Sequence, residues 1–167
     1  FVRDMSQDGV AAITRVSTSS AGKEANGHSR LADLSSDARY VLFESEATNL
    51  VSGDTNGRTD IFVKDRQTGE TRRVSTSGSG KQANDDSAAL SISADGRFVL
   101  FESEATNLVS GDKNSSTDLF VKDLETGAID RVSLKESGKE VAGPFATTAM
   151  MSADGQYIVF SSNAKLI

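Results

Sequence analysis

The sequence contains no cysteine and no tryptophan, and it has one proline and one histidine among 167 residues. Without cysteine, the chain has no disulfides, no thiolate nucleophile and no Cys-ligated metal. The single histidine, His28, lies in a polar stretch, and the sequence has no G-x-S-x-G motif. A Ser-His-Asp triad is therefore not indicated, because such a triad needs a serine context and a partner Asp. His28 is predicted to be an ordinary surface residue.

Long apolar runs and excess positive charge are also missing. No segment approaches the ~18 consecutive apolar residues of a membrane span, so we expect no membrane span. The formal net charge is −6, which argues against nucleic acid or an anionic membrane surface as a partner, because both attract a basic protein surface. The sequence begins at Phe1 rather than Met, so we expect a processed product or an excised piece.

A repeat of 58 residues dominates what is present. The stretch "VLFESEATNLVSGD" occurs at residues 41–54 and again, without change, at residues 99–112. "RVS" recurs at residues 15, 73 and 131, and "GK" recurs at residues 22, 80 and 138. "FVRD" at the start returns as "FVKD" at residues 62 and 120. A fixed period of this length indicates a repeat architecture in which each unit packs on its neighbours.

Each repeat contains four short β-type segments bounded by turn residues. In the second full copy they are expected at residues 89–93, 97–103, 118–123 and 128–133. They are rich in Val, Ile, Leu, Phe and Thr, as strands usually are. "SADGR" predicts a tight hairpin turn, because Asp-Gly tolerates the positive φ that such turns require. With no helical periodicity of comparable strength, we expect an all-β chain of four-stranded antiparallel units, which is typical of β-propeller blades.

The segment "SISADGRFVLFES…TDLFVKDLETGAIDRVS" resembles the repeat of TolB-type, or WD40-like (PD40), β-propellers. Blades of that family read approximately S-x-D-G-x-x-h-x-F-x-S, then D-h-a-h-x-D, then x-T-G-x-x-x-R-h-[ST], where h is hydrophobic and a aromatic. The resemblance covers nearly the whole chain and implies propeller blades. Two departures point to a divergent subfamily: the sequence lacks the proline often found before Asp-Gly, and it lacks tryptophan.

Counting strands predicts about three blades' worth of one β-propeller region spanning residues 1–167. Residues 1–17 would form the last two strands of one blade, and residues 147–162 the first two strands of another. Residues 31–75 and 89–133 would form complete blades. A closed propeller usually has about 4–8 blades, and natural proteins avoid open strand edges. Two alternatives follow: the chain is a fragment of a longer propeller, or two chains pair their half-blades into a six-bladed homodimer.

Strand order predicts that the longer loops gather at one end of each blade, where binding usually resides. In this long-loop end, "GDTNGRTD" and "GDKNSSTD" share the D-x-N-x-x-x-D spacing of calcium loops, in which oxygen ligands surround a hard cation. The candidate calcium ligands are Asp54, Asn56, Asp60, Asp112, Asn114 and Asp118. The alternative is that these residues only cap and turn an exposed loop.

Two further residue sets raise weaker hypotheses. The loops between blades share Lys23 with Lys81 and Asn26 with Asn84. These four residues are candidates for a small polar ligand, with loop capping as the alternative. The acidic pairs within "FESE" (Glu44, Glu46, Glu102 and Glu104) invite a glycosidase interpretation. Since nothing in the sequence would raise either pKa, a solvated acidic rim is favoured.

The function that these observations favour is a non-catalytic β-propeller binding or structural module. Calcium would stabilise it, and its long-loop end would meet a protein or a small polar ligand. One alternative is the propeller of a larger secreted or periplasmic enzyme, where related propellers gate a peptidase. Another is a TolB-like partner in envelope transport. The family resemblance implies a secreted, periplasmic or surface location.

Overall fold

The computed structural model describes residues 1–5, 13–114, 116–140, 145–162 and 166. Within these residues every regular element is a strand, so no helix there is available to span a membrane. The twelve strands are β1 (Val2–Arg3), β2 (Ile13–Thr14), β3 (Ser29–Leu34), β4 (Tyr40–Ser45), β5 (Asp60–Asp65), β6 (Thr71–Arg73), β7 (Ser87–Ile92), β8 (Phe98–Ser103), β9 (Asp118–Asp123), β10 (Ile129–Arg131), β11 (Phe145–Met151) and β12 (Ile158–Ser162).

The strands form four antiparallel sheets whose order follows the sequence. Two sheets have four strands, in the orders β3-β4-β5-β6 and β7-β8-β9-β10. They are flanked by two-stranded sheets, β1-β2 and β11-β12. The expected all-β fold of propeller blades is confirmed. The register is the same in both full blades. Phe43 lies opposite Phe62 in one blade, and Phe101 lies opposite Phe120 in the next. Both pairs stack, with ring centroids 5.6 and 5.5 Å apart.

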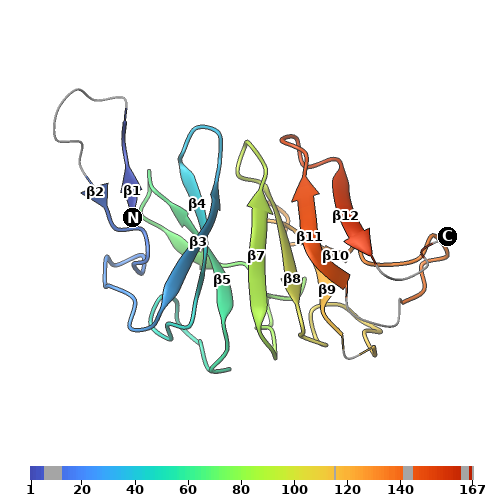
Figure 1. Ribbon diagram of the computed structural model, residues 1–167. Helices are drawn as coiled ribbons and strands as arrows, with labels where there is room; N and C mark the ends of the chain where they lie inside the picture. The colour runs from blue at the N-terminus through green and yellow to red at the C-terminus, as the bar shows by residue number, and fades with distance from the viewer. Residues whose placement is uncertain (6–12, 115, 141–144, 163–165, 167) are drawn as a thin grey trace.

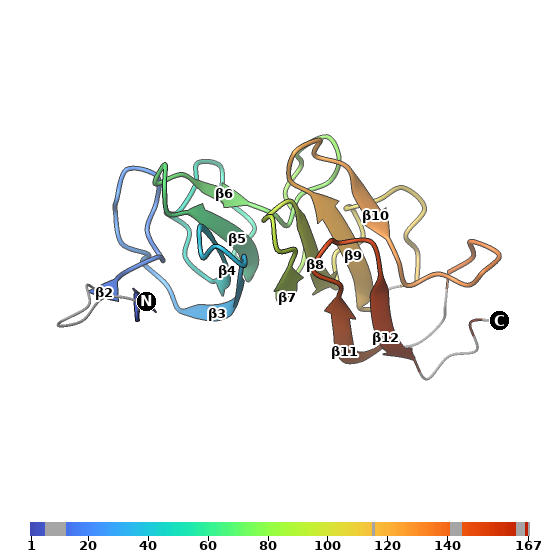
Figure 2. The same ribbon diagram turned by 90° about the horizontal axis from the view of Figure 1, so that it is seen from above.

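The sheets stand side by side and pack face to face. In Figure 1 they follow one another from the N-terminal to the C-terminal side of the molecule, and Figure 2 shows the first strands β3, β7 and β11 on one side and the last strands β6 and β10 on the other. β3 and β4 contact β7, and β11 contacts β7 and β8. Each full blade is therefore held by contacts with its neighbour in addition to its own hydrogen bonds.

Alternation along each strand explains why both faces of a blade are apolar. Leu42 belongs to a buried cluster with Ile92 and Val99 of the next blade, whereas its neighbour Phe43 belongs to a second cluster with Phe62 on the opposite face. Since successive side chains of a strand point to opposite faces, one strand supplies the interface with the next blade on one face and, on the other, an apolar surface that Ala47 and Leu50 cover. This accounts for the continuous apolar run "VLF" in place of an apolar-polar alternation.

The short hairpin turns at the other end of the blades are linked in series. The Ser36 amide donates to the Ala94 carbonyl, and the Ala94 amide donates to the Ala153 carbonyl. Gly96 has φ = 77°, and an added Cβ there would lie 2.1 Å from the ring of Tyr40 in the preceding blade. The corresponding residue of the first full blade is Ala38, which has φ = 56°. A left-handed conformation costs roughly 1–2 kcal/mol for a residue with a side chain.

This difference predicts opposite effects of matched substitutions. Ala38→Gly is expected to raise the free energy of unfolding by about 0.5–1 kcal/mol, because relief of strain exceeds the added entropy of glycine in the unfolded chain. Gly96→Ala is expected to lower it by about 2 kcal/mol or more, because strain and overlap with Tyr40 add. Urea titration followed by circular dichroism measures both. Equal changes in the free energy of unfolding for the two substitutions would contradict this account of strain at Ala38 and close packing at Gly96.

Candidate functional site

The repeated fourteen residues join the two long loops at the long-loop end of each blade. Asn26, in the loop before β3, accepts a hydrogen bond from the Thr48 amide (2.9 Å) and donates to the Thr48 hydroxyl (3.1 Å). The Asn49 side chain accepts from the Asn26 amide (3.0 Å) and donates to the Glu24 carbonyl (2.8 Å). The stretch "ATNL" is therefore a clamp between the β4–β5 loop and the loop before the blade.

The second blade repeats this clamp with the same distances. The Thr106 amide donates to Asn84 (2.9 Å), and the Asn84 side chain donates to the Thr106 hydroxyl (3.1 Å). Lys81 lies elsewhere, in an exposed hairpin turn where the Ser77 amide donates to the Lys81 carbonyl (2.9 Å). Asn26 and Asn84 thus have a capping role in the structure. A ligand role for Lys23, Asn26, Lys81 and Asn84 stays a prediction.

The predicted calcium loops do bring their residues together, and they do so around an arginine. In the first full blade, Arg73 of β6 places Nη1 at 3.3 Å from Asp60 and 3.6 Å from Asp54. The Asn56 side chain donates to Asp60 (3.3 Å). Gln82, from the loop between the blades, donates to both Asp54 (3.0 Å) and Asp60 (2.9 Å). The sequence spacing picks out Asp54, Asn56 and Asp60, which the structure brings together, but it gives Arg73 no role.

The second full blade builds the same cluster with one more acid. Arg131 of β10 places Nη1 at 3.0 Å from Asp112, 3.3 Å from Asp118 and 3.0 Å from Glu140. The side chains of Arg131, Asp112 and Asp118 are 8%, 2% and 1% exposed. Asn114 again donates to the second carboxylate, at 3.0 Å from Asp118. A buried guanidinium therefore sits among the carboxylates in both blades.

Electrostatics at this cluster reflects the balance between burial and the arginine. Burial raises the pKa of Asp112, and the neighbouring Asp118 raises it further, while Arg131 opposes both effects. Burial likewise raises the pKa of Asp54. Across the described ranges, no group of three or more His, Cys, Asp or Glu side chains is arranged to hold a metal ion. Calcium binding by Asp54, Asn56, Asp60, Asp112, Asn114 and Asp118 stays a prediction that the geometry alone does not test.

Removing the arginine should leave buried negative charge without compensation. Arg131→Met is expected to lower the free energy of unfolding by about 3–5 kcal/mol at pH 7, measured by urea titration. The deficit should shrink as the pH falls from 7 to 4. The variant holds the folded-state pKa of Asp112 further above the unfolded value, so protonation favours its folded state. Arg72→Met, at a more exposed arginine (43% against 8%), is the control. A pH-independent deficit would contradict this account.

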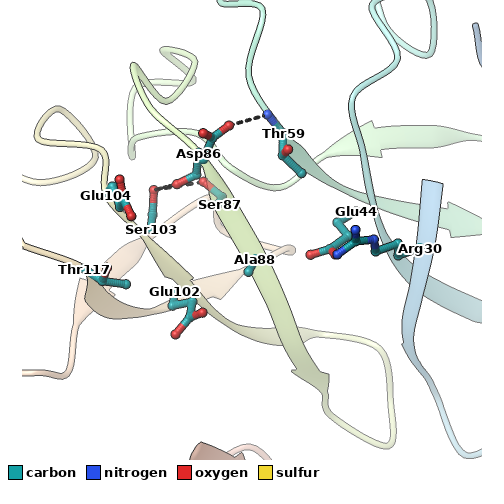
Figure 3. A pocket seen from close by; sticks show the side chains of 10 residues that line it. All are labelled: Arg30, Glu44, Thr59, Asp86, Ser87, Ala88, Glu102, Ser103, Glu104 and Thr117. Carbon is teal, nitrogen blue, oxygen red and sulfur yellow. Dashed lines mark hydrogen bonds and ion pairs between the residues drawn. The ribbon is translucent and has the colours of Figure 1, made fainter. Parts of the chain in front are cut away.

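A pocket of about 310 Å³ opens between the two full blades at the same end. It lies where β3 and β4 face β7 and β8 (Figure 3). The Asp86 carboxylate accepts from the Thr59 amide (2.7 Å), which ties the pocket wall to the end of the β4–β5 loop. Ser87 and Ser103 share a hydrogen bond (2.9 Å) beneath it. Most of the lining is polar, and its acids outnumber its single basic residue, Arg30.

One difference between the repeats leaves Glu102 in this pocket without an arginine opposite it. In the first blade Arg30 lies opposite Glu44, with Nη1 4.0 Å from the carboxylate. In the second blade Ala88 takes the place of Arg30 and lies opposite Glu102. Burial raises the pKa of Glu102, and repulsion from Glu44 and then Glu104 adds to the effect. Glu102 therefore contributes a poorly compensated negative charge to a concave surface.

The sequence only partly predicted this arrangement. A solvated acidic rim describes Glu46 and Glu104, which are exposed, but Glu44 and Glu102 are partly buried and line the pocket. His28 is exposed, as expected, and its carbonyl accepts from the Glu46 amide. The available signal was the Arg30-to-Ala88 difference between two repeats that share Glu44 and Glu102. It becomes meaningful only once the cross-strand register is known.

The sequence matches no family profile and no curated protein. Among solved structures, TolB from Acinetobacter baumannii is similar at 23% identity with a TM-score of 0.46, covering 83% of this chain and 27% of that one. A putative TolB from Agrobacterium tumefaciens is similar at 15% identity with a TM-score of 0.40, covering 81% and 51%. The chain thus spans roughly a quarter to a half of the length of these proteins. Similarity at this level carries no argument about function.

Proposed function

We propose that the chain is a non-catalytic β-propeller binding module that receives a basic side chain of a protein partner in the pocket between its two full blades. The observation that carries this proposal is the concave acidic surface around Glu102. Its volume suits one long side chain, being near the lower limit of typical ligand sites.

The position of the pocket supports a binding role. It lies at the end of the blades where the long loops gather, and the clamps built on Asn26 and Asn84 hold those loops to their neighbours. Binding residues commonly lie on loops held by a rigid scaffold. A partner that approaches this end would therefore meet preformed walls instead of loops that must be ordered first.

The charge of the pocket supports a cationic ligand group. Glu44, Asp86, Glu102 and Glu104 line it together with Arg30. Asp86 is engaged by Thr59 and Arg58, and Glu44 is near Arg30. Glu102 and Glu104 remain to attract an ammonium or guanidinium group, and such a contact would relieve the burial penalty that raises the pKa of Glu102.

Binding of a lysine-rich peptide tests this proposal. A fluorescein-labelled peptide with three lysines is expected to bind the wild type, and Glu102→Gln is expected to weaken binding by about 3–10-fold through loss of one charge pair. Glu70→Gln removes the same charge at the short-turn end of the blades and is the matched control. Fluorescence anisotropy measures both. Equal affinity of the two variants, or equal binding of a glutamate-rich peptide, would refute the proposal.

Calcium stabilisation of the long-loop end is the second part of the proposal. The D-x-N-x-x-x-D spacing supports it, and so does the convergence of Asp54, Asn56 and Asp60. A bound ion would have to displace or share these carboxylates with Arg73. The affinity is therefore expected to be weak, in the range of extracellular calcium modules near 10⁻⁴–10⁻³ M.

Thermal unfolding in calcium tests the metal directly. Millimolar calcium is expected to raise the melting temperature of the wild type relative to EDTA, because a ligand bound only to the folded state stabilises it. Asp54→Ala combined with Asp112→Ala is expected to abolish that rise. Magnesium at the same concentration controls for ionic strength. A wild type with the same melting temperature in calcium and EDTA would end the calcium hypothesis while leaving the peptide-binding proposal intact.

A secreted, periplasmic or surface location fits this proposal, because extracellular fluid supplies millimolar calcium. The alternative roles, as the propeller of a larger enzyme or as a TolB-like transport partner, rest on the family resemblance. No described contact favours either of them over the binding module.

A further inference from the structure

The two full blades carry matching residues at the pocket, because positions 58 residues apart correspond in the repeat. The second blade contributes Glu102, Ser103, Glu104 and Thr117, which correspond to Glu44, Ser45, Glu46 and Thr59 of the first. The two sets differ at two positions. Asp86 takes the place of His28. Ala88 takes the place of Arg30. Both blades thus present the same pair of glutamates, and the first blade adds two basic residues to them.

Arg30 accompanies the shared glutamate in the first blade. It lies on β3 opposite Glu44 of β4, with Nη1 4.0 Å from the carboxylate. Figure 3 shows Arg30 and Glu44 together on one side of Ala88, with Glu102 on the other. The Arg30 side chain is 83% exposed and that of Glu44 19%, so the guanidinium lies on the solvent side of the carboxylate. The first blade therefore supplies an arginine to its own copy of the site, which encloses about 80 Å³.

The second blade leaves the same position open. Ala88 of β7 lies opposite Glu102 of β8, in the register that Arg30 and Glu44 have in the first blade. An alanine side chain ends at Cβ, so it cannot reach the carboxylate. The pocket beside it has a volume of about 310 Å³. The second blade thus has the carboxylate and the space, but no arginine of its own.

The fold does not require an arginine at this position. Arg39 and Arg97, which correspond in the repeat, each hold an aspartate at 2.7 Å, so this pair is present in both blades. The pair between Arg30 and Glu44 is longer and is made in the first blade alone of these two. The second blade keeps the same strand register with Ala88. The difference between the repeats therefore concerns the pocket and not the blade itself.

We propose that the basic side chain received by the pocket is an arginine of the protein partner, which enters beside Ala88 and faces Glu102 as Arg30 faces Glu44. This inference rests on the proposed function and names the residue that the partner presents. Ala88 is then the residue that determines specificity, because its small side chain leaves the site open. A guanidinium suits the site better than an ammonium, because it is more weakly hydrated and offers five donors in a planar fork. Glu102 and Glu104 provide two carboxylates to accept them.

Peptide binding tests both the preference for arginine and the role of Ala88. A fluorescein-labelled peptide with three arginines is expected to bind the wild type about 3–10-fold more tightly than the same peptide with three lysines. Ala88→Arg supplies the arginine from within the chain and is expected to weaken binding of the arginine peptide about tenfold or more. Gln67→Arg adds the same charge at an exposed short turn and is the matched control, with the affinity of the wild type. Fluorescence anisotropy measures all three proteins.

A stability measurement tests the same contact without a peptide. Urea titration of Ala88→Arg, Glu102→Gln and the double variant forms a double-mutant cycle. If the introduced arginine faces Glu102, the two positions are expected to be coupled by about 1.5–5-fold in the equilibrium constant of unfolding, as for a partly exposed ion pair. Circular dichroism confirms that each variant is folded.

The possible failures are separable. Wild-type affinity of Ala88→Arg for the arginine peptide, binding of the lysine peptide as tightly as the arginine peptide, or an uncoupled cycle would each overturn the arginine inference. The proposed function would survive these results if Glu102→Gln still weakened binding of the lysine peptide. A wild type that binds neither peptide would overturn the proposed function and this inference together.

Discussion

Face-to-face burial between successive sheets is the constraint on which the rest of the structure depends. Leu42 and Phe43 leave the same strand toward opposite faces: the Leu42 face is covered by Ile92 and Val99 of the next blade, whereas the Phe43 face is covered by loop residues such as Leu50. A single four-stranded blade would expose one of these faces to water. Stability thus depends on contacts between neighbouring blades, as in other repeat proteins. The clusters and the pocket at the long-loop end are held by a scaffold that no single repeat forms alone.

Charge is managed differently at the two places where carboxylates gather. In the loop clusters, an arginine on the fourth strand (Arg73 or Arg131) enters among buried aspartates. In the pocket, the corresponding balance is present between Arg30 and Glu44 but absent at Glu102, because Ala88 replaces the arginine. The loop clusters therefore hold the blade together, while the pocket retains the negative charge on which the proposed binding function rests. If the second repeat had an arginine in place of Ala88, Glu102 would be paired as Glu44 is, and the pocket would lose this negative charge.

The fold could be predicted because its signals are local and repeated. "SADG" specifies a hairpin turn by itself, and the period of 58 residues carries the register from one blade to the next. The loop clusters were half predicted: sequence spacing identifies Asp54, Asn56 and Asp60, but Arg73 comes from a different strand, and nothing in local spacing points to it. The pocket could not be predicted, since it depends on which residues meet across β3–β4 and β7–β8 once two blades stack.

The same stacking rule gives the two ends of the chain a common physical problem. Leu34 faces outward on one side and Val159 on the other, although their counterparts Ile92 and Leu42 are buried against each other. Burying a large aliphatic side chain is worth about 1.5–3 kcal/mol, so both faces favour a cover of the kind the interior already uses.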